Sequence, residues 1–378
     1  MQIATIVSYL ESIAPLAYQE SYDNAGLLTG SADWECSGVL TTLDVTEAVV
    51  QEAVSRGLNL IVAHHPIIFS GLKKINGKNY VEKTVIAAIK QDIAIYAIHT
   101  NLDNVMSEGV NGRIAAQLGL VNSSLLSARE GVLQKLYCFV PLAHLGPVRH
   151  AIFEAGGGHI GNYSECSWSA EGIGTFKGGE GTDPFVGQPG LRHEEKEMRL
   201  EVILPAWLSG GVIKAMIRAH PYEEVAYDLV NLANRHGGVG SGLIGELPEP
   251  MEERAFLDRI REVFRVPVVR HTRLTGQTVK TVAVCGGAGS FLIFKALQAG
   301  ANFYITSDVK YHEFFDANDR MVIADIGHFE SEQFTIDLLF EVLRNNFSTF
   351  AVLKSETKTN PVNYYSGDAG GRSAEGQL

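Results

Sequence analysis

Short apolar runs alternate with amphipathic stretches along most of the chain, and this rhythm is the feature that most restricts the fold. In the first part, it predicts strands at residues 38–43, 58–63 and 93–98 and helices at residues 46–56, 81–90 and 110–118. Strands that alternate with helices are typical of βαβ units, which build a largely parallel sheet. The sequence therefore predicts an α/β fold.

The pattern changes after about residue 130. There, the sequence predicts strands at residues 135–140, 196–204 and 225–231, helices at 145–155 and 209–219, and strand edges within the glycine-rich passage 156–190. The order β-α-β-β-α-β is the ferredoxin-like pattern. We therefore expect an α+β insert over residues 131–238.

The α/β rhythm returns after the insert. It predicts helices at residues 256–264, 291–299 and 331–345 and strands at residues 279–285, 303–306 and 321–326. We expect residues 1–130 and 239–364 to form one discontinuous α/β domain. Residues 365–378 have no apolar face to bury, so we expect a flexible tail there.

Composition limits the location and the partners of the protein. The 378 residues carry a formal net charge of -12, which opposes binding to nucleic acid or anionic lipid because such binding needs concentrated Lys and Arg. No apolar stretch approaches the roughly 20 residues that span a bilayer, and we find no signal-peptide pattern. The 4 cysteines form no Cys-x-x-Cys pair. We expect a cytoplasmic protein without disulfides.

Polar side chains gather where the predicted strands end. The four clusters are His64 with His65, His99 with Asp103, Ser307 and Asp308 with Tyr311 and His312, and His328 with Glu332. Ligands of an open parallel sheet collect beyond the carboxyl ends of its strands. Imidazoles and carboxylates suit zinc, iron or manganese, and two such ions can activate water for hydrolysis. A single histidine at a strand end is more often structural, but four such clusters favour a metal site.

Two glycine-containing segments offer weaker signals. The segment 71–79 nearly spells a P-loop, but its spacing is wrong and it ends in Asn. Its lysines, Lys73, Lys74 and Lys78, either meet substrate phosphates or, more commonly for a loop, face solvent. The segment 286–290 joins a strand to a helix and could hold an anion, although a tight turn is the simpler interpretation.

Five segments together resemble the NIF-three-like family, whose members are called GTP cyclohydrolase 1 type 2 homologues. These segments are ESYDNAGL at 20–27, AHHPIIF at 63–69, HTNLD at 99–103, SDVKYH at 307–312 and DIGHFESE at 325–332. The family often has Trp where Tyr22 stands, a departure that affects no ligand. The insert resembles the CutA-like or PII-like module of longer bacterial members, and HPYEE at 220–224 is its most recognisable stretch. We interpret that pentapeptide as structural, not as a second metal site.

The resemblance implies a dinuclear metal centre. It places the two divalent ions on five residues, His64, His65, Asp103, His328 and Glu332, and leaves His99 either as a neighbour of the ligands or as a packed structural residue. It also implies hydrolytic opening of the guanine ring of GTP, or of another nucleotide, with release of formate. A ring-shaped homohexamer is the implied assembly.

Two other functions fit the same residues. The two-metal geometry would also serve a phosphoesterase. A non-catalytic metal-binding or regulatory protein, with the insert recruiting a partner, is the alternative of another class. An open coordination position at the metals distinguishes an enzyme from such a binding protein.

Overall fold

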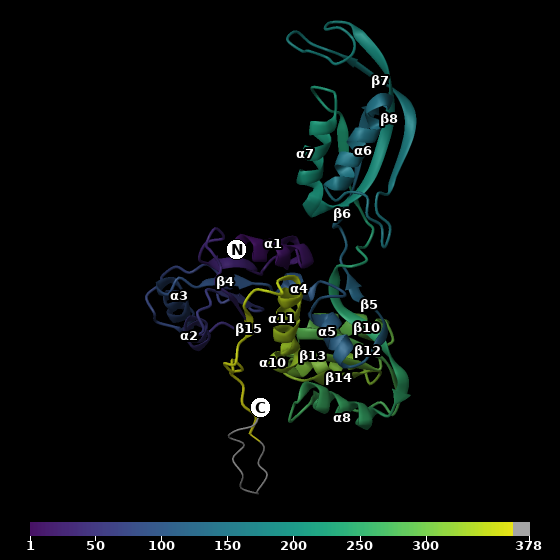
Figure 1. The fold of residues 1–378 in the computed structure, drawn as a ribbon. Helices are drawn as coiled ribbons and strands as arrows, with labels where there is room; N and C mark the ends of the chain where they lie inside the picture. The colour runs from purple at the N-terminus through teal and green to yellow at the C-terminus, as the bar shows by residue number, and fades with distance from the viewer. Residues whose placement is uncertain (366–378) are drawn as a thin grey trace. The chain divides into compact units, whose positions relative to one another are not determined.

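The computed structural model describes residues 1–365, which divide into two compact units (Figure 1). One unit comprises Met1–Ser127 together with the chain from Ser241 onward, and the other comprises Ala128–Gly240. The predicted flexible tail lies, apart from Tyr365, outside the described residues. Within residues 1–365, we find no helix with the length and apolar content needed to cross a membrane.

The first sheet of the larger unit is built mainly from the N-terminal part of the chain. Its strand order is β1 (Gly26–Thr29), β4 (Ala94–Ala97), β3 (Leu60–Ala63), β2 (Val39–Thr42) and β15 (Val352–Lys354). All neighbours pair in parallel except β1, which is antiparallel to β4. Helices α2 (Glu47–Ser55) and α3 (Tyr80–Lys90) pack on one face of this sheet, because Val49 and Val85 join its buried aliphatic side chains.

The second sheet is built mainly from the part that follows the insert. Its order is β11 (Arg270–His271), β14 (Val322–Asp325), β13 (Phe303–Ser307), β12 (Val279–Ala288), β10 (Gly240–Met251) and β5 (Val121–Ala128). Strands β12, β13 and β14 are parallel, and helix α9 (Ile293–Gln298) covers one face. The two sheets exchange edge strands, since β5 comes from the N-terminal part and β15 from the C-terminal part.

A single hydrophobic core joins the remaining faces of both sheets. Side chains of β2, β3 and β4 share it with those of β12, β13 and β14. The helices that complete this core are α1 (Ile3–Ile13), α5 (Val110–Gln117), α8 (Glu253–Phe264) and α11 (Phe334–Asn346). The predicted α/β class is therefore confirmed, with two sheets around one core in place of a single sheet.

The smaller unit has the predicted order of elements. It runs β6 (Leu133–Pro141), α6 (Leu145–Glu154), β7 (Ser167–Lys177), β8 (Arg192–Pro205), α7 (Ser209–Ala219) and β9 (Tyr227–Leu232). The sheet order is β7-β8-β6-β9, with every pairing antiparallel. Figure 1 shows α6 and α7 on one face of this sheet, where Val148 and Val212 are fully buried. The likeness to CutA-like or PII-like modules stays a prediction.

Several elements differ from the sequence expectation. The predicted helix 331–345 is two helices, α10 (His328–Glu332) and α11, which meet at Gln333. The earlier start places His328 and Glu332 one helical turn apart. The helices α1 and α4 (Thr100–Asp103) and the strands β1, β5, β10, β11 and β15 were not predicted from the sequence.

Packing of α8 against the second sheet should stabilise the larger unit. Phe256 is fully buried and meets Phe303 edge to face, with 4.9 Å between the ring centroids. We expect Phe256→Ala to lower the free energy of unfolding by about 3–5 kcal/mol, because it removes apolar contacts and leaves a cavity. Phe294→Ala, at a side chain 65% exposed, is the matched control in urea unfolding. Equal losses for both variants would contradict this account.

Candidate metal centre

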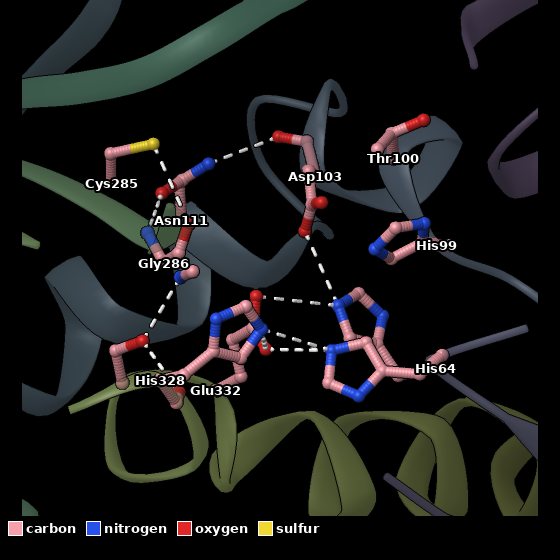
Figure 2. Close-up of polar contacts among 12 residues, drawn as sticks. His64, His99, Thr100, Asp103, Asn111, Cys285, Gly286, His328 and Glu332 are labelled. Carbon is pink, nitrogen blue, oxygen red and sulfur yellow. Dashed lines mark hydrogen bonds and ion pairs between the residues drawn. The ribbon is translucent and has the colours of Figure 1, made fainter. Parts of the chain in front are cut away.

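Polar side chains from both sheets converge beyond the carboxyl ends of the parallel strands. His64 and His65 follow β3 directly, and Asp103 ends the short helix α4 (Thr100–Asp103) after β4. From the other sheet, α10 contributes His328 and Glu332 after β14. Figure 2 shows His64, Asp103, His328 and Glu332 directed towards one another. The structure thus brings all five predicted ligands together.

One group of donor atoms consists of His64, Asp103 and Glu332. The His64 Nε2 atom lies 3.6 Å from Asp103 Oδ1 and 3.7 Å from Glu332 Oε1. Both distances are too long for a hydrogen bond. Within the described residues, His64 Nε2 and Asp103 Oδ1 are buried and have no hydrogen-bond partner. Buried polar atoms without partners are costly, so these two atoms need a ligand.

A second group consists of His65, His328 and the same glutamate. Glu332 Oε2 lies 2.9 Å from His65 Nε2 and 3.1 Å from His328 Nε2. The two imidazole Nε2 atoms are 3.3 Å apart. Glu332 therefore turns one oxygen to each group, which is the position of a bridging carboxylate.

Each ligand imidazole is oriented from behind by an acceptor on its Nδ1 atom. His64 Nδ1 donates to the Ile98 carbonyl at 2.9 Å. The Asp44 carboxylate accepts from His65 Nδ1 at 2.8 Å, and the Asp308 carboxylate accepts from His328 Nδ1 at 2.6 Å. These contacts hold the protons on Nδ1 and aim the Nε2 atoms at the centre, as second partners of metal-bound histidines do.

The protonation states reflect burial and neighbouring charge. Burial lowers the pKa of His64 to about 4, against the pull of Glu332, so this imidazole is neutral. Burial also lowers the pKa of His65, but hydrogen bonds to Asp44 and Glu332 outweigh it and raise that pKa to about 10. For His328, burial is likewise outweighed by Glu332 and Asp308, and the pKa rises to about 9.

The two ligand carboxylates shift in opposite directions. Burial and the nearby Glu332 charge raise the pKa of Asp103 well above its ordinary value. Burial would raise the pKa of Glu332 too, but the three surrounding histidines hold it well below its ordinary value. The centre therefore contains an ionised carboxylate, Glu332, between imidazoles.

The donor set fits divalent metal ions. Imidazole nitrogen and carboxylate oxygen are the ligands of zinc, iron and manganese, at distances of about 2.0–2.2 Å for zinc. Donor atoms that share one such ion lie about 3–3.5 Å apart, close to the separations in both groups. The partnerless His64 Nε2 and Asp103 Oδ1 atoms support the same fit.

His99 stands beside the five predicted ligands. Its Nδ1 atom donates to Asp23 Oδ1 at 2.8 Å, and Asp23 also accepts from the backbone and hydroxyl of Thr100. Burial raises the pKa of Asp23, but hydrogen bonds from His99 and Thr100 lower it to about 2. An ionised Asp23 thus holds the His99 Nδ1 proton, and a ring nitrogen of His99 lies within 4.8 Å of donor atoms of His64 and His65.

The centre opens into a cavity of about 1240 Å³ in the larger unit. His65, Asp103, His328 and Glu332 line it, together with the Gly286–Gly287 turn. Gly287 has a φ of +64°, and a Cβ atom there would collide with Glu332 Oε1. Glycine at this turn therefore lets the backbone approach the bridging carboxylate.

The structure separates the remaining sequence candidates. Asp308 joins the centre, but Tyr311 and His312 lie outside the lining of the cavity. There, Tyr311 meets the Phe315 ring edge to face and His312 stacks on it. In the smaller unit, His220 Nε2 donates to the Phe139 carbonyl and His220 Nδ1 accepts from the Tyr222 amide. Both nitrogens of that histidine serve the local structure.

Two carboxylates behind the ligands were missed in the sequence. Asp44 follows β2 and Asp23 precedes β1, so each stands at a strand end like the ligands themselves. Their position beside a strand was the available signal. The sequence around Asp44 and Asp23 does not indicate which histidine each carboxylate orients.

Comparison with known proteins identifies the family. The family model described as Duf34/NIF3 (NGG1p interacting factor 3) matches residues 1–361. The chain belongs to the Duf34/NIF3 family. A relative from Halalkalibacterium halodurans named GTP cyclohydrolase 1 type 2 homolog is 39% identical, over 95% of this chain and 98% of the relative. A relative of the same name from Staphylococcus aureus is 33% identical, over 96% and 100%.

Solved structures of the family are also similar to this chain. A Bacillus cereus protein related to NIF3 has a TM-score of 0.82 at 39% identity, covering 97% of this chain and 99% of that one. The Staphylococcus aureus protein SA1388 has a TM-score of 0.78 at 30% identity, with the same coverage. These matches confirm the resemblance stated from the five sequence segments.

Proton release should accompany metal binding. Because the pKa values of His65 and His328 are about 10 and about 9, both imidazoles are protonated at pH 7 in the metal-free protein. A metal ion needs the Nε2 lone pairs, so we expect binding to release about two protons and to strengthen by up to about a hundredfold per pH unit between pH 6 and 8. Calorimetric titration with zinc in buffers of different ionisation enthalpy measures this release.

The matched control for this titration is His271→Gln, at an exposed histidine outside the cavity. It should leave both the proton count and the pH dependence unchanged. A zinc affinity that stays constant from pH 6 to pH 8 would contradict the protonation states described above.

Proposed function

We propose that the protein is a dinuclear metal-dependent hydrolase. The observation that carries the proposal is Glu332, whose two carboxylate oxygens face two separate groups of donor atoms at the wall of one cavity. His64, Asp103 and Glu332 would hold one divalent ion, and His65, His328 and Glu332 the other. Zinc, iron or manganese suits these donors.

Two divalent ions at such a centre would lower the pKa of water and stabilise negative charge that develops on the substrate. The chain's own residues set the geometry. Asp44 and Asp308 fix the tautomers of His65 and His328, and the Ile98 carbonyl does the same for His64. Fixed imidazoles keep the donor atoms in place through a turnover, with no reorganisation at the reacting atoms.

His99 is suited to move the proton. Asp23 accepts a hydrogen bond from His99 Nδ1. The Nε2 atom can therefore accept a proton from the attacking water and later donate it to a leaving nitrogen. The edge of Phe69 packs against the His99 ring, with 5.6 Å between centroids at 88°, and limits its movement.

The relatives' name supplies the leading reaction type, hydrolytic opening of a guanine ring, and makes GTP the first substrate to test. In GTP ring opening, one water attacks the imidazole carbon of guanine and breaks a ring bond, and a second water releases that carbon as formate. The cavity of about 1240 Å³ has room for a nucleotide-sized molecule. A cytoplasmic location and a ring-shaped homohexamer remain predictions from the sequence and the resemblance.

Loss of one ligand should abolish turnover. We expect His328→Ala to remove formate release from GTP and to lower the bound metal, because the second donor group then keeps only His65 and Glu332. Metal analysis of the purified protein and a formate assay test both effects, with a screen over other nucleotides and phosphoesters. A parent that holds metal and releases neither formate nor phosphate would favour the binding or regulatory role.

Replacing His99 should lower the rate of turnover more than it lowers the content of bound metal. We expect His99→Gln to reduce kcat by about 10²–10⁴-fold, with metal content unchanged. His312→Gln, at a histidine outside the cavity, is the matched control. Loss of metal together with activity in His99→Gln would instead make His99 a ligand.

A further inference from the structure

The wall of the cavity carries mostly negative charge. Besides the ligands Asp103 and Glu332, five more carboxylates line it: Glu20, Asp44, Asp308, Asp325 and Glu330. Among the described residues of the lining, Arg270 is the one Lys or Arg side chain. Two divalent ions and Arg270 together would offset five of the seven negative charges, so the wall keeps a net negative charge even when the centre is loaded.

Arg270 has other partners. One of its guanidinium nitrogens donates to Asp325 Oδ2 at 2.9 Å, and another donates to the Val309 carbonyl at 3.2 Å. The guanidinium also lies 5.1 Å from the centroid of the Phe314 ring. A guanidinium held in this way stabilises the loop around β14 and is poorly placed to turn towards a phosphate.

The glycine-rich turn beside the centre offers few free amides. Gly286 N donates to Asn111 Oδ1 at 3.0 Å, as Figure 2 shows, and Gly287 N donates to Ser331 Oγ at 2.9 Å. Gly289 N donates to Thr306 Oγ1 at 3.0 Å. These backbone groups therefore do not form a phosphate cradle. The lysines of segment 71–79 lie outside the lining.

Exposed aromatic rings form much of the remaining wall. Six of the aromatic side chains in the described lining are exposed: Tyr22, Phe69, Tyr80, Phe291, Tyr364 and Tyr365, each at least 44%. Large exposed rings around a concave site commonly mark ligand contacts. Flat rings stack on flat heterocycles, and that contact requires no charge on the ligand.

We propose that the cavity selects a planar heteroaromatic molecule with little or no negative charge, of the size of a purine base or nucleoside, over a nucleoside triphosphate. The proposal rests on the proposed function, since this molecule is the substrate of the same hydrolytic centre. The aromatic wall takes the ring, and the carboxylates accept hydrogen bonds from its N–H groups. A triphosphate would be repelled by the carboxylates of the wall that the metal ions and Arg270 do not neutralise.

Equilibrium binding to the full, metal-loaded protein tests the proposal. The probes are guanosine, GMP and GTP, with saturating Mg²⁺ present and the bound metal measured afterwards to exclude stripping by the triphosphate. We expect GTP to bind at least about tenfold more weakly than guanosine, with the difference shrinking as salt rises, because salt screens repulsion. GTP binding as tightly as guanosine or more tightly, or no binding by any of the three, would overturn the proposal.

Two variants separate ring contact from charge. Phe69→Leu should weaken the binding of guanosine about tenfold. Phe294→Leu, at an exposed ring outside the lining, should leave that affinity unchanged. Glu20→Gln keeps an oxygen that can accept from Asn104 Nδ2 but removes one charge, so it should strengthen GTP binding and change guanosine binding less. Equal effects of Phe69→Leu and Phe294→Leu, or no gain for GTP in Glu20→Gln, would overturn the proposal.

Turnover then distinguishes this proposal from the proposed function. If guanosine binds tightly but yields no product, the preference for an uncharged ring is supported and the proposed hydrolase activity is contradicted. If formate is released faster from GTP than from guanosine, the hydrolase activity is supported and the preference for an uncharged ring is contradicted.

Discussion

The ionised carboxylate of Glu332 is the constraint on which the rest of the centre depends. Its side chain is 3% exposed, and burying such a charge costs several kcal/mol unless it is paired. His65 and His328 provide that pairing in the metal-free protein, and metal ions could provide it when bound. Because the two histidines come from different sheets, neutralising this charge requires the larger unit to close around its single core.

A repeated arrangement surrounds that carboxylate. Each imidazole of the centre has an acceptor behind it, which is the Ile98 carbonyl for His64 and a carboxylate for each of His65, His99 and His328. The three carboxylates among these acceptors add negative charge around the site, which favours the binding of cations. The same carboxylates leave the adjoining cavity unfavourable for polyanions, so metal affinity and substrate charge are set by one feature of the site.

The fold class and the gathering of polar residues at strand ends could be predicted because both depend on local pattern, whereas the resemblance to the family selected the five converging residues among them. Buried strands such as 58–63 read as apolar runs, and the polar residues after them mark the sheet edge at which ligands collect. His328 and Glu332 are four residues apart, a spacing that places both side chains on one face of a helix.

Other parts depend on contacts between distant segments. Strands β5 and β10 contain Ser, Gly or Pro, and their pairing in the sheet outweighs a weak local propensity. Asp23 and Asp44 are remote in sequence from the histidines they orient, and only the fold brings each pair together. The sharing of Glu332 between two donor groups likewise has no local signature.

The exchange of edge strands makes completion of the first sheet depend on a segment that is synthesised long after its other strands. Strand β2 lies between β3 and β15, so one side of β2 has no strand partner until Val352–Lys354 has left the ribosome. The N-terminal donors His64, His65 and Asp103 likewise wait for α10. A polypeptide terminated before α10 would lack Glu332, and neither donor group would be complete, so unfinished chains could not sequester metal at this centre.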